Sequence, residues 1–313
     1  MQEKRNVIFV AGPTAVGKTK YAIEIAKAFH GEIISADSMQ IYKYMDIGSA
    51  KPTKEELAQA KHYLVDEIDP RDEFSVAEYQ ALAKSCIEKV FGEGKIPVVS
   101  GGTGLYLNSL IYDMDFSVMP KQAGFRKQLE EEAKEFGFEY VHNKLKRLDP
   151  AAAARIHPNN LKKVIRALEV YETTGEVIRE FQESFVPTQD YGCILIGLSR
   201  ERGELYRRID ERVDRLIEAG LIKEVEALLK KGLTENSISM KGIGYKEMIS
   251  YLHGEFDLSE AVRLVKRNTR RYAKRQLTWL RRYPDMIWFD LSEYPSEKEA
   301  LSAIFDAIRS RIV

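Results

Sequence analysis

The sequence of 313 residues has little that would suit an oxidising compartment or a membrane. It holds two cysteines, Cys86 and Cys193, which lie far apart on apolar segments, so we expect no disulfide framework. It has no run of about 18 apolar residues, which excludes a transmembrane helix. No signal-peptide pattern precedes the first apolar stretch. These absences predict a cytoplasmic protein without membrane contact, and we expect a monomer.

The sequence also lacks a net charge and a cluster of metal ligands. Its five histidines show no zinc-binding spacing. It has 48 basic and 48 acidic side chains, yet residues 261–284 contain nine Lys or Arg and no Asp or Glu. A neutral protein with one strongly basic segment is expected to make a localised contact with a polyanion.

Residues 12–19, GPTAVGKT, match the phosphate-loop pattern of Gly, four residues, Gly, Lys and Thr. An apolar run at 7–10 precedes them, and a helical pattern at 19–29 follows, as this motif requires. Glycines let backbone N–H groups curve around an anion, and the helix N-terminus adds its dipole. Lys18 adds a charge, and the Thr19 hydroxyl can bind Mg²⁺. The expected phosphate-binding residues are Gly12, Thr14, Ala15, Val16, Gly17, Lys18 and Thr19.

The chain outside this loop predicts an α/β fold. Short apolar strands are expected at 7–10, 32–36, 95–100, 193–198 and 286–289, alternating with helices. This pattern indicates a P-loop NTPase-like core, with a parallel five-stranded sheet and helices on both faces. Residues 121–183 lack strand patterns, and we expect helices at 121–136, 138–148 and 160–174, with Pro150 and Pro158 as breaks. The predicted domains are a core of residues 1–118 and 187–313 and an inserted all-helical domain of residues 119–186.

Three further groups of residues could carry chemistry near the phosphate loop. Asp37 follows the second strand, and it could bind Mg²⁺ through water, act as a general base or only cap a turn. Thr103 belongs to a second glycine loop, 101–106, which could face substrate or only form a tight turn. Arg208 and Arg212 share one helical face and could neutralise phosphate charge or form surface ion pairs.

The basic segment at 261–284 has a helical pattern. Arg263, Arg267, Arg271 and Arg275 form a stripe of arginines four residues apart, dense enough to repel one another without an anionic partner. Several phosphate contacts would make binding salt-sensitive. A solvated cationic face is the alternative.

Seven motifs in this order resemble the tRNA dimethylallyltransferases over essentially the whole chain. They are GPTAVGKT, DSMQIY, MDIGSAKPT, GGTGLY, IRALEVYETTG, GIGYKE and TRRYAKRQLTWLRR. The sequence departs from the family at Tyr63, where members commonly show a second His. The resemblance implies that the loop holds the pyrophosphate of dimethylallyl diphosphate. The acceptor would be N6 of the adenosine 3′ of the tRNA anticodon.

The same resemblance implies roles for individual residues. Asp37 matches the general base, and Arg208 would bind the pyrophosphate with Mg²⁺ near Thr19. Lys18, Thr19 and Thr103 would complete the catalytic set. The expected contacts to the tRNA anticodon stem-loop are Asp37, Ser38, Met39, Gln40, Thr103, Arg126, Lys162, Lys163, Arg166, Lys241, Gly242, Gly244, Arg267, Arg271 and Arg275.

Two other functions remain compatible with parts of the sequence. A small-molecule kinase would explain the phosphate loop and a helical lid but not the basic helix. A nucleotide-switched RNA-binding module would leave Asp37 and Arg208 without a task.

Overall fold

A computed structural model describes residues 5–114, 123–175, 177 and 186–312. The chain divides into two compact units, one of Met1–Ile111 and Thr188–Val313 and one of Tyr112–Pro187. The predicted domain boundary at 118/119 lies outside the described residues. Among the described residues, no helix is long and apolar enough to span a bilayer.

The first unit is built on a parallel six-stranded sheet with the order β3-β2-β4-β1-β5-β6. Its strands are β1 Asn6–Ala11, β2 Gly31–Ala36, β3 His62–Tyr63, β4 Ile96–Gly101, β5 Gly192–Ser199 and β6 Ile287–Asp290. The five predicted strands are confirmed. The predicted strand number was one too low, because β3 is only two residues long and forms through pairing with β2.

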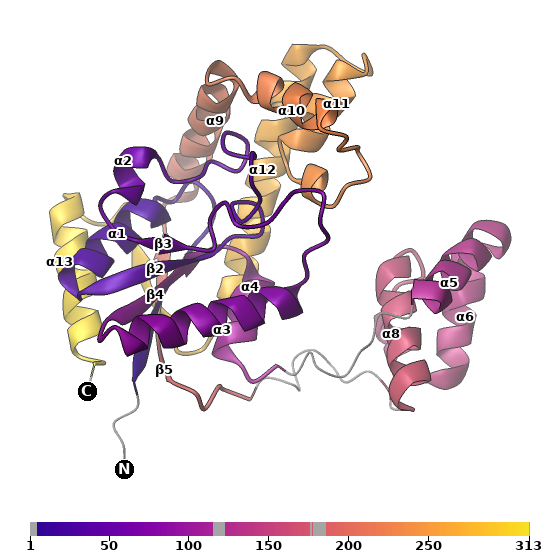
Figure 1. The fold of residues 1–313 in the computed structure, drawn as a ribbon, viewed down its shortest axis with the longest axis horizontal. Helices are drawn as coiled ribbons and strands as arrows, with labels where there is room; N and C mark the ends of the chain where they lie inside the picture. Colours follow the sequence, from indigo (N-terminus) through magenta and orange to yellow (C-terminus); the bar gives the residue numbers. More distant parts are fainter. Residues whose placement is uncertain (1–4, 115–122, 176, 178–185, 313) are drawn as a thin grey trace. The chain divides into compact units, whose positions relative to one another are not determined.

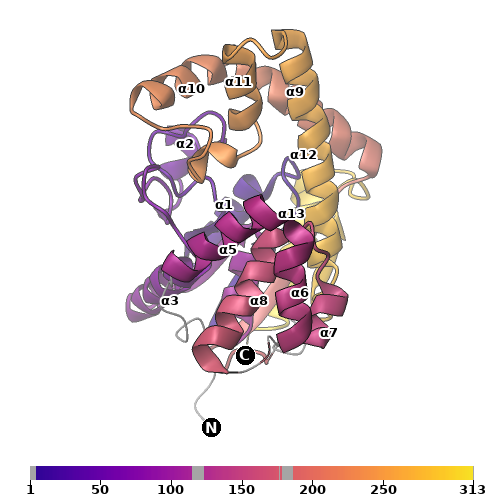
Figure 2. The same cartoon turned by 90° about the vertical axis from the view of Figure 1, so that its right-hand side faces the viewer.

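Helices cover both faces of this sheet, as predicted (Figure 1). They are α1 Lys18–Ala28, α2 Lys54–Leu57, α3 Val76–Gly92, α4 Gly104–Ile111, α9 Arg202–Glu218, α10 Leu221–Lys230, α11 Tyr245–Leu252, α12 Leu258–Leu280 and α13 Glu297–Arg309, with a short 3-10 turn at Ser239–Lys241. Figure 2 shows α9 and α12 side by side.

The core of this unit follows from the apolar strands. Ile8 and Val10 of β1 are fully buried with Ile25 of α1 and Ile304 of α13, and this cluster fills one face of the sheet. On the other face, α3 packs on β2 and β4. At the start of α3, a Ser75 capping box satisfies the first backbone N–H groups, an arrangement that contributes about 1 kcal/mol.

The second unit contains four helices with a core of their own. They are α5 Ala123–Phe136, α6 Phe138–Leu148, α7 Pro150–Arg155 and α8 Leu161–Thr174. Buried apolar residues such as Leu129, Val141 and Leu168 hold them together. The predicted break at Pro150 is confirmed, because α6 ends at Leu148. The helix α7 was not predicted; it begins at this proline, and Asp149 caps it. Proline suits that position, where a backbone N–H would have no helical partner.

Candidate active site

The phosphate loop joins β1 to α1 and bends through two left-handed residues. Ala15 and Gly17 have φ angles of 64° and 111°. Gly12 leaves no space for a side chain, because a Cβ there would lie 2.8 Å from the Leu198 carbonyl oxygen. The first backbone N–H groups of α1 lack partners within the helix. The loop therefore presents amide donors and a positive helix end to an anion.

Lys18 is the first residue of α1, and its Nζ donates to the Pro13 carbonyl oxygen at 2.8 Å. Burial lowers the pKa of Lys18 to about 8, although the nearby Asp37 carboxylate raises it, and Arg212 lowers it further. An anion bound in the loop would favour the protonated form of Lys18. The lysine is thus mostly charged at neutral pH, and a bound diphosphate would keep it charged at higher pH.

Two arginines from the segment after β5 donate to carbonyl oxygens of the same loop. Arg208 Nε donates to Ala15 at 3.0 Å, and Arg200 Nε donates to Val16 at 3.0 Å. Burial lowers the pKa of Arg208, and the positive charge of Arg200 lowers it further. Like charges held this close disfavour one another, so an anion in the loop would stabilise them.

Arg212 lies one helical turn after Arg208. Burial lowers its pKa, whereas the Asp37 carboxylate raises it. Arg212 therefore belongs to the same charged group as Lys18 and Asp37. Arg200 was not among the predicted site residues, although its place directly after a strand at the same edge of the sheet was a usable signal.

Asp37 follows β2 and shapes the turn there. Its Oδ1 accepts hydrogen bonds from the backbone N–H groups of Met39 at 2.9 Å and Gln40 at 3.3 Å. Its charge acts on both Lys18 and Arg212. Asp37 thus makes the turn-capping contacts and also faces the cationic side of the site. Of the three predicted roles of Asp37, the turn cap is therefore confirmed, and the roles as Mg²⁺ ligand and as general base stay predictions.

The second glycine loop is joined to the Asp37 turn. Thr103 Oγ1 accepts a hydrogen bond from Ser38 N at 3.1 Å, and Thr103 N donates to the Ala36 carbonyl oxygen at 3.3 Å. A Cβ at Gly101 would lie 2.1 Å from the same carbonyl oxygen. The two loops therefore meet closely where β2 and β4 end.

Gln276 of α12 fastens this second loop to the phosphate loop. Its Oε1 accepts from Thr14 N at 2.9 Å, and its Nε2 donates to the Gly102 carbonyl oxygen at 2.9 Å. The backbone N–H of Thr14 is therefore engaged by a side chain. Gln276 was not among the predicted site residues, because a single glutamine in a basic helix has no distinguishing pattern.

The segment around Gly242 approaches the residues that follow Asp37. A Cβ at Gly242 would lie 2.6 Å from the Met39 methyl carbon. The Glu224 carboxylate accepts hydrogen bonds from the backbone N–H groups of residues 46–48 at 2.7–2.9 Å, and from the Tyr245 hydroxyl at 2.8 Å. Glu224 thus fixes the MDIGS loop against α11. Nearby, Lys241 is exposed and Gly244 has a φ of 100°.

The predicted arginine stripe on α12 is partly exposed. Arg271 and Arg275 are exposed, whereas Arg267 is half-buried and its Nε has no hydrogen-bond partner among the described residues. Arg263 is paired with Glu260, its Nε lying 2.6 Å from the carboxylate. Among the described residues, Arg271 and Arg275 are therefore the exposed arginines of the stripe that form no ion pair.

The remaining predicted RNA contacts lie in the helical unit. Arg126 of α5 makes two hydrogen bonds to the Glu169 carboxylate of α8, at 2.9 and 2.8 Å. Lys162, Lys163 and Arg166 are exposed on α8. Arg126 therefore also has a structural role within this unit.

The protein oxygen atoms at the phosphate loop suit a metal ion that binds together with a phosphate ligand. No group of three or more His, Cys, Asp or Glu side chains that could hold a metal exists in the part of the chain that the structure describes. Mg²⁺ commonly binds one or two protein oxygens together with phosphate oxygens and water. The half-buried Thr19, at the second position of α1, offers such an oxygen.

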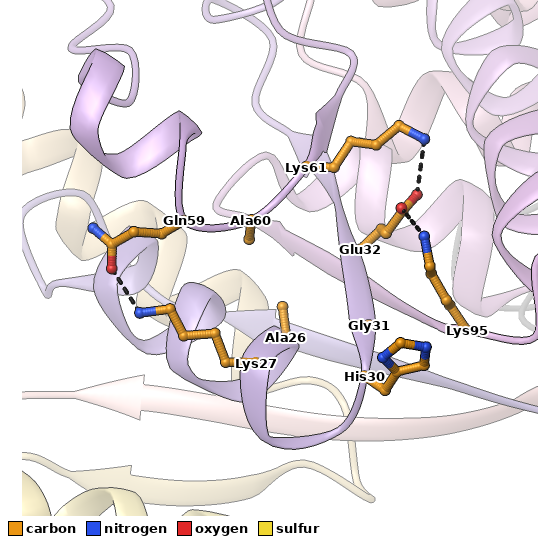
Figure 3. A pocket seen from close by; sticks show the side chains of 9 residues that line it. All are labelled: Ala26, Lys27, His30, Gly31, Glu32, Gln59, Ala60, Lys61 and Lys95. Carbon is orange, nitrogen blue, oxygen red and sulfur yellow. Dashed lines mark hydrogen bonds and ion pairs between the residues drawn. The ribbon is translucent and has the colours of Figure 1, made fainter.

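A hollow of about 200 Å³ lies far from this chemistry, where β2 and β4 begin (Figure 3). Lys95 and Lys61 both approach the buried Glu32 carboxylate there, at 2.6 and 3.3 Å. Tyr63, the departure from the family pattern, donates its hydroxyl to Glu32 at 2.7 Å. These hydrogen bonds lower the pKa of Glu32 to about 2, although burial opposes them. The cations of this hollow are neutralised by the protein itself.

Comparison with known proteins identifies the family of this chain. The model of the IPP transferase family matches residues 40–283. A tRNA dimethylallyltransferase of Alkaliphilus oremlandii is 57% identical over 293 residues, covering 94% of each chain. One from Acetivibrio thermocellus is 54% identical over 297 residues, covering 95% of each.

Solved structures show the same similarity. The full-length tRNA isopentenylpyrophosphate transferase of Bacillus halodurans has a TM-score of 0.75 and 42% identity, covering 99% of this chain and 97% of that one. A eukaryotic dimethylallyltransferase acting on tRNA has a TM-score of 0.85 and 28% identity, covering 98% of this chain and 80% of that one. The phosphate loop, the fold and these similarities together show that the chain belongs to the IPP transferase family.

Proposed function

We propose that this protein transfers the dimethylallyl group of dimethylallyl diphosphate to N6 of the adenosine 3′ of a tRNA anticodon and releases pyrophosphate. The observation that carries the proposal is the juxtaposition of one carboxylate, Asp37, with the cations of a phosphate loop. The relatives named above carry the matching activity in their names.

The acceptor nitrogen needs a base, because the lone pair of an adenine amino group is delocalised into the ring. Asp37 would take the N6 proton as the new bond between N6 and the allylic carbon forms. One oxygen of Asp37, Oδ1, is occupied by the turn. That turn would hold the Asp37 carboxylate in a fixed orientation toward the adenine of the tRNA.

The leaving group needs positive charge. As the bond between the allylic carbon and the diphosphate oxygen breaks, negative charge develops on pyrophosphate. Loop N–H groups, Lys18 and Arg208 would stabilise that charge. Arg200 and Arg212 would add to the same field. A divalent metal at Thr19 would supply further charge neutralisation when bound.

The RNA would be held by surfaces of the core unit and of the helical unit. The exposed Arg271 and Arg275 of α12 would contact phosphates, as would Lys241 beside the Asp37 turn. The target adenosine must leave its stack to reach a carboxylate at the end of a strand. Ser38, Met39, Gln40 and Thr103 would line its path. Arg126, Lys162, Lys163 and Arg166 of the helical unit are proposed contacts to the anticodon stem.

The test uses purified protein, Mg²⁺, radiolabelled dimethylallyl diphosphate and unmodified tRNA, with ATP in a parallel reaction. Label in RNA supports the proposal. Consumption of ATP with transfer of its phosphate supports a kinase. Binding of RNA without any product supports an RNA-binding module.

A further inference from the structure

The proposed transfer reaction needs no chemical group from Gln276, so the place of this side chain calls for another explanation. It lies on α12, one residue after the exposed Arg275, yet only 6% of its surface is accessible. Burying an amide is costly unless its polar atoms are hydrogen-bonded. Both ends of this amide are hydrogen-bonded to backbone atoms of loops distant in sequence.

The first contact is to the phosphate loop. The Oε1 of Gln276 accepts the backbone N–H of Thr14, the third residue of the loop motif, at 2.9 Å. This donor is therefore committed before any anion binds. Gln276 thereby fixes the orientation of the Thr14 peptide and of the donors that follow it.

The second contact is to the glycine loop after β4. The Nε2 of Gln276 donates to the Gly102 carbonyl oxygen at 2.9 Å. A Cβ at Gly102 would lie 2.3 Å from that nitrogen and 2.9 Å from the Gly12 carbonyl oxygen. Only glycine lets the helix, the phosphate loop and the second loop come this close. The two hydrogen bonds of Gln276 depend on this close packing, so a small shift of α12 would move both loops.

The connection continues to the proposed base. Tyr272 lies one turn before Gln276. Burial raises the pKa of Tyr272 to about 12, and the Asp37 charge raises it further, whereas contacts of its hydroxyl with Thr103 and Gln276 oppose this. Thr103 in turn accepts the Ser38 N–H next to Asp37. One face of α12 thus contacts the phosphate loop and the second glycine loop, and Thr103 of that second loop contacts the Asp37 turn.

The opposite side of the same helix carries the exposed arginines. Arg271 and Arg275 bracket the turn that holds Tyr272, and the Arg275 guanidinium lies 5.6 Å from the Tyr272 ring centre. Phosphates bound to these arginines would relieve their mutual repulsion and restrict the helix. A helix moves as a rigid element, so a restricted α12 would also restrict the loops that it holds.

From this geometry we infer that Gln276 is a positioning residue that couples RNA binding on α12 to diphosphate binding in the phosphate loop. The inference rests on the proposed function, because it takes α12 as an RNA-binding surface. Reciprocity then requires that each ligand strengthen the binding of the other by the same factor. Gln276 would give the enzyme a means to hold its diphosphate most tightly when tRNA is present.

The experiment measures the dissociation constants of inorganic pyrophosphate with Mg²⁺, and of unmodified tRNA, each alone and in the presence of the other. The variant is Gln276→Met, which keeps the length of the side chain and removes both hydrogen bonds. The matched control is Thr278→Ala, because the Thr278 hydroxyl donates to the Lys274 carbonyl oxygen of the same helix and bonds to no other described residue. Thermal unfolding checks that each variant is folded.

The wild type and Thr278→Ala should show a coupling factor of about tenfold, within the usual range for linked sites. In Gln276→Met the factor should fall to about one, while pyrophosphate alone binds about tenfold more weakly and tRNA alone changes less than about twofold. In turnover, the KM for the prenyl diphosphate should rise while the KM for tRNA stays nearly constant. A merely structural role would lower the unfolding temperature and leave the coupling unchanged.

The outcomes separate this inference from the proposed function. A wild type that prenylates tRNA but shows no coupling contradicts the inference alone, as does a folded Gln276→Met protein that retains the coupling. A wild type that couples the two ligands but transfers no prenyl group contradicts the proposed function alone. A wild type that binds no tRNA contradicts both.

Discussion

Replacing Asp37 by Asn tests the proposed base while sparing the turn that the same residue forms. The Oδ1 of Asp37 accepts two backbone hydrogen bonds, from Met39 and Gln40. An asparagine oxygen can accept both, so the free energy of unfolding should change by less than about 1 kcal/mol. A general base accelerates a reaction by about 10²–10⁴-fold. Its loss should therefore raise the activation barrier by about 3–5 kcal/mol.

Asp37→Ala is the matched comparison, because it removes the base and the two turn contacts together. It should lose a similar factor in rate and, in addition, about 1–2 kcal/mol of stability. The assay is single-turnover prenyl transfer with both substrates bound, alongside thermal unfolding and the dissociation constant for tRNA. Transfer by Asp37→Asn at the wild-type rate would refute the base role. A loss of activity explained by weakened tRNA binding would assign Asp37 to recognition instead.

Three further predictions concern charge and anchoring. The pKa of Lys18 is about 8, and its protonated form binds the anion. The ratio of the pyrophosphate affinity of the wild type to that of Lys18→Met should therefore be constant below pH 8 and fall above it. A ratio that does not change with pH in calorimetry would contradict this. Arg271→Glu should weaken tRNA binding and reduce the slope of log affinity against log salt by about one phosphate contact; an unchanged slope would remove that side chain from the interface. Glu224→Ala should lower the free energy of unfolding by about 1–3 kcal/mol, because three backbone N–H groups lose their acceptor. Glu224→Gln keeps an acceptor oxygen, so its free energy of unfolding should fall by less. Equal losses of stability for the two variants in chemical denaturation would contradict the anchoring role.

The elements that sequence reasoning predicted correctly are those specified locally. The strands after Arg5 and Lys95 each contain an unbroken run of at least four apolar residues, and α3 begins at the Ser75 cap that its sequence indicates. Such patterns depend on neighbouring residues alone. The α/β fold and the position of the phosphate loop follow from them.

The features that were missed depend on contacts between distant segments. The two-residue strand β3 exists because it pairs with β2, and its own residues carry no strand pattern. The break at Pro150 was predicted correctly, but the short helix α7 that starts there under the Asp149 cap was not. The contacts of Gln276 with Thr14 and Gly102 join positions 262 and 174 residues apart. Residue spacing in the sequence cannot predict hydrogen bonds between segments this far apart.

The central claim is that the phosphate loop holds a diphosphate that leaves from a prenyl group as the adenosine nitrogen attacks. The most direct measurement is the stoichiometry of one reaction, with pyrophosphate release followed in solution and the modified nucleoside located by digestion of the tRNA. The account predicts one pyrophosphate per N6-dimethylallyl adenosine at the position 3′ of the anticodon, and neither product with Asp37→Asn on the same time scale. Pyrophosphate release without modified adenosine, or phosphate transfer from ATP, would contradict it.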